Sequence, residues 1–154
     1  MEVRLARKKD VDEIVELWKY MMDFHGEIHP YFKTGPKGDK NFRGFLKRQI
    51  GSSGSLVLVA EDQGRIIGFC LGLIMEYPPV FIHRKKGHIN DMVVAEDYQK
   101  KEVGKELLLS ALNWFKQVGI AHVELDVAKG NQIADAFYRK NGFEVIMQRM
   151  LRKL

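Results

Sequence analysis

The residues best suited to bind a phosphate lie at positions 99–105, between a predicted strand and a predicted helix. The first turn of a helix has unpaired backbone N–H groups and a partial positive charge, and both favour an anion. Gly104 has no side chain to block a phosphate, and Lys101 and Lys105 add positive charge. The glycines of a P-loop or of a dinucleotide-binding loop are absent. The segment therefore indicates a phosphate site without identifying its ligand.

A second group of residues lies near the C-terminus, where Asn131 and Tyr138 precede Asn141-Gly142-Phe143. Asn131 is a typical N-cap residue for a helix. Tyr138 fits a packed aromatic side chain whose hydroxyl group has a hydrogen-bond partner. Taken alone, this group favours a structural role over a chemical one.

The elements that must position these residues follow from the spacing of the apolar residues. Asp10, with Glu13 three residues later, predicts a capping box that starts an amphipathic helix ending near residues 25–26. We expect, in chain order, strand 2–8, helices at 10–26 and 42–50, strands at 55–60, 66–76 and 88–95, helix 103–118, strand 121–127, helix 131–140 and strand 143–152. This order predicts an α/β chain with mixed strand directions.

Composition limits the function classes. A chain of 154 residues with 45% hydrophobic and 29% charged residues suits one folded domain and excludes general disorder. The lone Cys70 excludes an internal disulfide framework and a cysteine zinc cluster. His25 and His29 have the spacing of helical metal ligands, but Pro30 ends the helix, so we expect no metal site.

Charge and hydropathy restrict the partners. The net charge of +5 favours anionic ligands in general. No helix-turn-helix, zinc finger or aromatic RNA-binding platform is evident, so we expect no nucleic acid partner. No apolar run reaches the ~18 residues of a membrane helix, and the first ten residues lack the apolar stretch of a signal peptide. We therefore expect a cytoplasmic protein with no membrane partner.

Together, residues 88–110 and 123–143 resemble the GNAT superfamily of acetyl-CoA-dependent N-acetyltransferases. There, a Leu-x-Val strand leads to Gln/Arg-x-x-Gly-x-Gly/Ala at the start of a helix. The matching residues here are Met92-Val93-Val94, then Gln99, Glu102 and Gly104. Later come a hydrophobic strand, an asparagine, a small residue and Tyr-x-x-x-Gly-Phe, matched here by residues 123–127, Asn131, Ala134 and residues 138–143. The chain departs from the pattern at Glu102, which replaces a glycine and places an acid near the expected pyrophosphate.

The resemblance implies one GNAT-like domain over residues 1–154, with a mixed, mostly antiparallel sheet and helices on both faces. Acetyl-CoA would lie between the splayed, parallel fourth and fifth strands, at residues 88–95 and 121–127. The backbone of Met92 and Val94 would pair with the pantetheine arm, and Asn131 would contact the same arm. The implied cofactor-binding residues are Met92, Val93, Val94, Gln99, Lys100, Lys101, Glu102, Val103, Gly104, Lys105, Asn131 and Tyr138.

Acetyl transfer to an amine sets three chemical requirements. A lysine-like amine has a pKa of about 10.4, so a base must remove a proton before the amine can attack. Donors must stabilise the oxyanion, and an acid must protonate the leaving thiolate. The resemblance implies that Tyr138 is the acid and that the backbone N–H of Val94 donates a hydrogen bond to the oxyanion.

The base has three candidates. The resemblance places Asp126 at the position of a glutamate that some members carry twelve residues before the tyrosine. Other members carry a glutamate at the position of Asn90, which is no base but is able to hold a water. Asp91 is adjacent to Asn90, and strict alternation along a strand predicts that its side chain faces the opposite side of the sheet from that of Asn90.

The acceptor site is implied by the same resemblance to include Phe24, His25 and Tyr31, in a segment whose acids and aromatic rings suit a cationic amine. The acceptor is thus expected to be a primary amine on a small molecule, a peptide or a protein, and a homodimer is compatible with the superfamily. An alternative is a catalytically silent acetyl-CoA sensor or scaffold of the same fold. Glu102 and the missing acid at position 90 favour that alternative.

Overall fold

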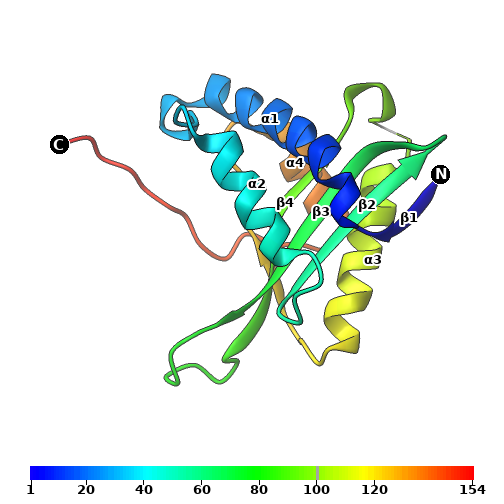
Figure 1. Ribbon diagram of the computed structural model, residues 1–154. Coiled ribbons are helices and arrows are strands. Elements are labelled where there is room, and N and C mark those ends of the chain that lie inside the picture. The colour runs from blue at the N-terminus through cyan, green and yellow to red at the C-terminus, as the bar shows by residue number, and fades with distance from the viewer. Residues whose placement is uncertain (100) are drawn as a thin grey trace.

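Helices cover both faces of one five-stranded sheet in the computed structural model, which describes residues 1–99 and 101–154 (Figure 1). The strands lie in the order β1 (Glu2–Leu5), β2 (Ser55–Asp62), β3 (Arg65–Glu76), β4 (Lys85–Val94) and β5 (Val123–Leu125). Neighbouring strands are antiparallel except β4 and β5, which are parallel. The predicted mixed sheet is therefore confirmed.

The helices are α1 (Val11–Ile28), α2 (Gly38–Gln49), α3 (Val103–Gln117) and α4 (Gln132–Lys140), with short 3-10 turns at Lys8–Asp10, Pro30–Phe32 and Glu96–Tyr98. On one face of the sheet, Trp18 of α1 stacks on Phe42 of α2 with ring centroids 4.4 Å apart. Phe42 in turn contacts Phe69 of β3. These aromatic contacts join α1 and α2 to the sheet as one layer of the core (Figure 1).

The other face is covered by α3, whose buried Phe115 lies over two glycines in neighbouring strands. A Cβ atom at Gly72 would come within 2.9 Å of the Phe115 ring, and one at Gly87 within 2.7 Å. Real Cβ atoms do not approach so closely, so both glycines are explained by packing. This contact sets the distance between α3 and strands β3 and β4.

The capping box predicted at Asp10 and Glu13 is wrong in its partners. The Asp10 carboxylate accepts hydrogen bonds from the Arg4 guanidinium at 2.8 and 3.0 Å and from the Arg7 N–H at 2.7 Å. The hydrogen bond from Arg4 lowers the pKa of Asp10. Glu13 instead accepts a hydrogen bond from the Ile66 N–H at 3.0 Å. Both acids therefore join α1 to the sheet, because tertiary partners outcompete the local cap.

The last predicted strand, at residues 143–152, is absent. No residue from 143 to 154 belongs to a helix or strand, and this C-terminal tail extends away from the sheet (Figure 1). Its apolar side chains are exposed, with Ile146 at 74% and Met147 at 82%. A strand exists only beside a partner strand, and the tail lies outside the ladder of this chain's sheet. Among the described residues, no helix is long and apolar enough to span a bilayer.

Candidate active site

Strands β4 and β5 pair over a short distance and then part. Their register runs from Gly87 opposite Val123 to Ile89 opposite Leu125. Among the residues that the structure describes, no later pair joins the two strands. β4 continues to Val94 with β3 on its other side. The splayed parallel strands expected from the sequence are therefore present, although β5 is shorter than predicted.

The open edge of β4 presents backbone groups toward β5. On the β3 side, the Ala95 N–H donates to the Ile67 oxygen at 2.8 Å. Successive N–H groups of a strand point to opposite edges, so the Val94 and Met92 groups point to the edge where β5 has departed. The side chain of Val93 is buried in the core beside α1 and α2. The backbone of Val93 pairs with Phe69 of β3, so neither its side chain nor its backbone groups face this opening, against the expectation that Val93 binds the cofactor.

A β-bulge occurs at Asn90, where the two strands separate. On β3, Leu71 pairs with Asp91 and Gly72 pairs with Ile89, so Asn90 has no partner residue. An extra residue interrupts the alternation of side chains along a strand. The Asn90 Nδ2 donates a hydrogen bond to the Asp91 Oδ2 at 2.5 Å. Asp91 is thus in contact with Asn90, against the expectation from strict alternation.

The first turn of α3 leaves its backbone N–H groups without a side-chain cap. Gly104 lies in this turn, and a Cβ there would come no closer than 3.7 Å to Val94 and Phe137. That is ordinary contact, so packing does not require glycine, although glycine costs a helix about 1 kcal/mol relative to alanine. The missing side chain of Gly104 and the uncapped amides together suit the close approach of an anion.

Glu102 precedes α3 in a left-handed backbone conformation with φ 63°. Glycine adopts this conformation more easily than glutamate does, which explains the glycine that the acetyltransferase pattern has here. The Glu102 side chain is 70% exposed and its carboxylate lies 3.2 Å from the Lys105 Nζ. The acid therefore points outward, and Lys105 partly neutralises it.

The remaining residues of the predicted phosphate segment lie around the same turn. Gln99 donates from Nε2 to the Val94 oxygen at 3.4 Å. The Lys101 Nζ lies 4.8 Å from the centre of the Tyr98 ring. Val103 is buried, so only its backbone faces the opening. Lys100, which was predicted as a further phosphate contact, lies outside the described residues.

Helix α4 starts with a complete cap and carries Tyr138. The Asn131 Oδ1 accepts a hydrogen bond from the Ala134 N–H at 3.1 Å, which confirms the predicted N-cap. Gly142, with φ 88°, turns the chain so that Phe143 packs on the Tyr138 ring at a centroid distance of 5.6 Å. Tyr138 also contacts Phe137, the ring that lies nearest Gly104. The structure therefore brings Tyr138, Val94 and the start of α3 together.

Burial controls the protonation of this region. Burial is the main cause that raises the pKa of Tyr138, and the charges of Cys70 and Asp91 raise it further. The Tyr138 hydroxyl therefore stays protonated at neutral pH and is able to donate. Burial also raises the pKa of Asp91, against the opposing effects of the Asn90 hydrogen bond and of His25 and His88. Burial raises the pKa of the Cys70 thiol to about 12, which fits an unreactive core residue.

Asp126, a candidate base from the sequence, lies apart from this buried group. Its side chain is 73% exposed, and its Oδ2 lies 3.6 Å from the Arg149 Nη2 in the C-terminal tail. Asp126 is therefore directed to solvent and to the tail, whereas Asp91 is buried beside Asn90.

The end of α1 lies over the gap between β4 and β5. A Cβ at Gly130, in the loop before α4, would be 3.4 Å from Ile28. His25 lies close enough to Asp91 to oppose the rise that burial causes in the pKa of Asp91. The His25 Nδ1 lies 2.8 Å from the Met21 oxygen, so in the neutral ring Nε2 has the free lone pair. Of the other predicted acceptor residues, Phe24 is 40% exposed and Tyr31 is 64% exposed.

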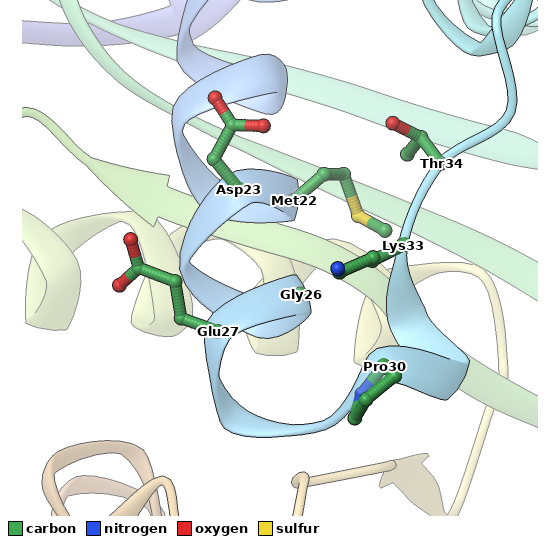
Figure 2. Close-up of a pocket in the computed structure, with 7 residues that line it drawn as sticks. All are labelled: Met22, Asp23, Gly26, Glu27, Pro30, Lys33 and Thr34. Atoms are coloured by element: carbon green, nitrogen blue, oxygen red, sulfur yellow. The ribbon is translucent and has the colours of Figure 1, made fainter.

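A cavity of about 730 Å³ opens between the end of α1 and the segment after Pro30 (Figure 2). It is lined by Met22, Asp23, Gly26, Glu27, Pro30, Lys33 and Thr34. Figure 2 shows Met22 and Lys33 pointing toward one another across the hollow, with Asp23 and Glu27 on the same helix as Met22. Sequence analysis did not single out Met22, Lys33 or Thr34. The only signal was Gly26 inside the helix, where a Cβ would be 3.3 Å from the Lys33 Cγ.

Among residues 1–99 and 101–154, no three His, Cys, Asp or Glu side chains are grouped as metal ligands. The residues present do suit a ligand that carries phosphate and an extended amide arm. The uncapped turn with Gly104 suits the phosphate, and the open edge of β4 suits the amide arm.

Comparisons with known proteins agree with this geometry. The chain is 26% identical over 151 residues to an N-alpha-acetyltransferase of Sulfurisphaera tokodaii, covering 94% of this chain and 80% of that one. It is 26% identical over 150 residues to a spermidine N(1)-acetyltransferase of Thermoplasma acidophilum, covering 94% and 89%. A predicted acetyltransferase of Clostridium acetobutylicum, solved with acetyl-CoA, shares the fold with a TM-score of 0.82 at 18% identity, covering 99% and 95%. The sequence model of the Acetyltransferase (GNAT) family matches residues 17–143, so this chain belongs to the GNAT family of acetyltransferases.

Proposed function

We propose that this protein transfers the acetyl group of acetyl-CoA to a primary amine, by direct attack while both substrates are bound. One observation carries the proposal. The uncapped first turn of α3, with its unexplained Gly104, lies beside the unpaired edge of β4 and the aromatic residues of α4. An anion site, a free strand edge and a half-buried hydroxyl group are the three features that a nucleotide thioester requires, and they support the proposal.

The binding roles follow from the positions of these groups. The amides of the first turn of α3 hold the pyrophosphate, which approaches over Gly104, and Lys101 and Lys105 add charge. The Met92 and Val94 backbone groups pair with the pantetheine arm as a short additional strand. The Asn131 Oδ1 is already used by the cap, so its contact to the same arm is made by Nδ2.

Acetyl transfer then needs one hydrogen-bond donor at the carbonyl oxygen of the thioester and another at its leaving sulfur. Acetyl-CoA supplies a thioester whose carbonyl carbon is attacked by the amine and whose sulfur leaves. The Val94 N–H donates to the carbonyl oxygen, and Tyr138 donates its proton toward the sulfur. The raised pKa makes Tyr138 a weaker acid than an alkyl thiol, whose pKa is about 8.5. The hydrogen bond from the Tyr138 hydroxyl to the sulfur is therefore strongest when negative charge has developed on the leaving sulfur.

We assign removal of the amine proton to Asp91, which receives it through a water that Asn90 helps to hold. Asp91 is buried, its pKa is raised by burial, and its carboxylate is joined to the exposed Asn90. Its charge also acts on Tyr138. Asp126, the other carboxylate candidate, is exposed and paired with Arg149. The buried group is therefore the better base.

A pH–rate profile separates the two carboxylates. Asp91 must be ionised to accept a proton, so kcat/KM should rise with pH through a midpoint above the ordinary carboxyl pKa of about 3.9. Asp91→Asn should remove this ascending limb, whereas Asp126→Asn should keep it. If the limb disappears only in Asp126→Asn, the assignment of the base moves to Asp126.

The acceptor proposed is a cationic primary amine that reaches the gap between β4 and β5 past the end of α1. The aromatic faces of Phe24 and Tyr31 and the acids Asp23 and Glu27 suit a positive charge. The two relatives named above are named for the acetylation of an α-amine and of spermidine, so α-amines and polyamines both belong in the screen.

The test combines a melting curve with a screen of amines. Acetyl-CoA should raise the melting temperature because it binds the folded state alone. Free thiol should then appear with at least one peptide N-terminus or polyamine. A melting shift without thiol release from any amine would favour the silent acetyl-CoA sensor, for which Glu102 and Asn90 are the support. No shift at millimolar acetyl-CoA would exclude both functions.

A further inference from the structure

The cavity at the end of α1 is lined by charges of both signs. Lys33 comes from the segment that leads to α2, whereas Asp23 and Glu27 come from α1 (Figure 2). Among the residues that the structure describes, none forms an ion pair with any of these three side chains. The two acids are one helical turn apart, and like charges at this spacing repel each other. The walls of the cavity therefore hold a cation and a pair of anions that the fold itself does not neutralise.

Lys33 is anchored through its backbone and through the base of its side chain. Its N–H donates to the Pro30 oxygen at 3.1 Å, which closes the short turn at Pro30–Phe32. A Cβ at Gly26 would lie 3.3 Å from the Lys33 Cγ and 3.8 Å from the Lys33 Cα. Glycine is less favourable than alanine inside a helix, and this close approach explains the glycine in α1. The ammonium group of Lys33 thus extends from a stem that is packed on α1, and it points across the hollow toward Met22 (Figure 2).

We propose that this cavity selects a small diamino acid as the acceptor, and that Lys33 binds the carboxylate of that acceptor. The inference rests on the proposed transfer of an acetyl group to an amine. A diamino acid has one amine more than the reaction uses, so its second, protonated amine pairs with Asp23 or Glu27 while its carboxylate pairs with Lys33. The cavity of about 730 Å³ has the size of a small-molecule site.

Lys33 distinguishes a diamino acid from a polyamine. A polyamine carries only cationic groups, so the two acids attract it while Lys33 repels it. An amino acid with a single amine would satisfy Lys33 but would bring no second cation to the acids. Only an acceptor with charges of both signs complements the whole lining. Because Lys33 is exposed, water screens each of these pairs, and the selection is expressed as a ratio between acceptors rather than as complete exclusion.

Two pairs of matched acceptors test the proposal on the full chain. L-Lysine and cadaverine differ only in the carboxylate, and L-lysine and L-norleucine differ only in the second amine. We expect kcat/KM, measured by thiol release from acetyl-CoA, to be highest for lysine. Lys33→Met keeps the stem and removes the charge, so it should lower the ratio of kcat/KM for lysine to that for cadaverine by about fivefold or more. Lys37→Met is the matched control, because Lys37 is exposed in the same loop but does not line the cavity, and it should keep the original ratio.

Calorimetry with the protein saturated with coenzyme A measures acceptor binding without turnover. Lysine should bind severalfold more weakly to Lys33→Met than to the unchanged protein or to Lys37→Met. A preference of the unchanged protein for cadaverine, or an equal ratio in the two lysine variants, would overturn the proposal.

The two proposals fail in different ways. If the selection of a diamino acid is wrong, acetyl-CoA should still raise the melting temperature and another amine should still release thiol. If lysine binds in a manner that depends on Lys33 but no amine releases thiol, the proposed transfer is wrong and the diamino acid site stands.

Discussion

Helices α3 and α4 each follow one of the two parallel strands, yet they begin in different ways. The start of α3 has no side-chain cap, a left-handed Glu102 before it and a glycine in its first turn. The start of α4 is closed by the Asn131 side chain, which accepts a hydrogen bond from Ala134. One helix start leaves its amides available to a ligand, and the other satisfies its amides within the protein.

The difference assigns separate tasks to the two helices. α3 is suited to hold the anionic end of a cofactor, at the cost of an unfavourable backbone and an unfavourable helix residue. α4 is held firmly at its start and by the packing of Phe143 on Tyr138, so it is suited to present a hydroxyl group at a fixed place. Changes at α3 should therefore affect affinity, and changes in α4 should affect turnover or stability.

The largest effect is expected in α4, at Tyr138. Tyr138→Phe should lower kcat by about 10²-fold or more, since a positioned general acid contributes that much. The acetyl-CoA Kd should change little, because the ring and its packing remain. Stopped-flow thiol release and calorimetry measure the two quantities. A wild-type rate in Tyr138→Phe would show that the hydroxyl takes no part in the reaction.

Next in size is the replacement of Gly104 in α3. Gly104→Ala should weaken acetyl-CoA binding about tenfold, because its methyl group would fill the space over the amides, yet it should stabilise the free protein by up to about 1 kcal/mol. Gly44→Ala is the matched control. Gly44 lies within α2, where a Cβ would meet only the Arg48 guanidinium at 3.6 Å, so a similar gain in stability should come with unchanged binding. If both variants bind acetyl-CoA normally, the start of α3 is not the anion site.

A smaller effect, this time a gain in affinity for acetyl-CoA, is expected from replacing Glu102. Glu102→Gly relieves the left-handed conformation, which is worth about 1 kcal/mol for a residue with a side chain. It also removes a negative charge near the bound phosphates, so acetyl-CoA should bind severalfold more tightly. Glu102→Gln, which removes the charge and keeps the strain, is the comparison. Weaker binding in Glu102→Gly would contradict the placement of the phosphates beside this residue.

The smallest effect on activity is expected at Asn131. Asn131→Ala should destabilise the fold by about 1 kcal/mol through loss of the cap. Asn131→Asp keeps an oxygen for the Ala134 N–H but removes the amide donor proposed for the pantetheine arm. Urea melts measure the first effect, and acetyl-CoA titration of Asn131→Asp measures the second. Equal affinity in Asn131→Asp and the unchanged protein would limit Asn131 to its structural role.

Sequence analysis predicted features that depend on neighbours along the chain. It placed the Asn131 cap and the start of the helix at residue 103 correctly, because caps and helix starts involve residues within a few positions of each other. It also predicted the four strands that the sheet contains between residues 55 and 127, which are β2 to β5. It was wrong about the partners of Asp10 and Glu13, because Arg4 and the Ile66 N–H reach those acids from other elements.

Local pattern determined the four helices and the five strands of the sheet to within a few residues, since these follow from side-chain spacing and backbone preference. Register, strand partners and burial were settled only by folding. The bulge at Asn90 arises from the pairing of β3 with β4 and brings Asp91 beside Asn90. The tail has the residues of a strand, yet the structure leaves it outside the sheet. Partners distant in sequence meet only through the packing of the whole sheet, and packing also decides which carboxylate is buried.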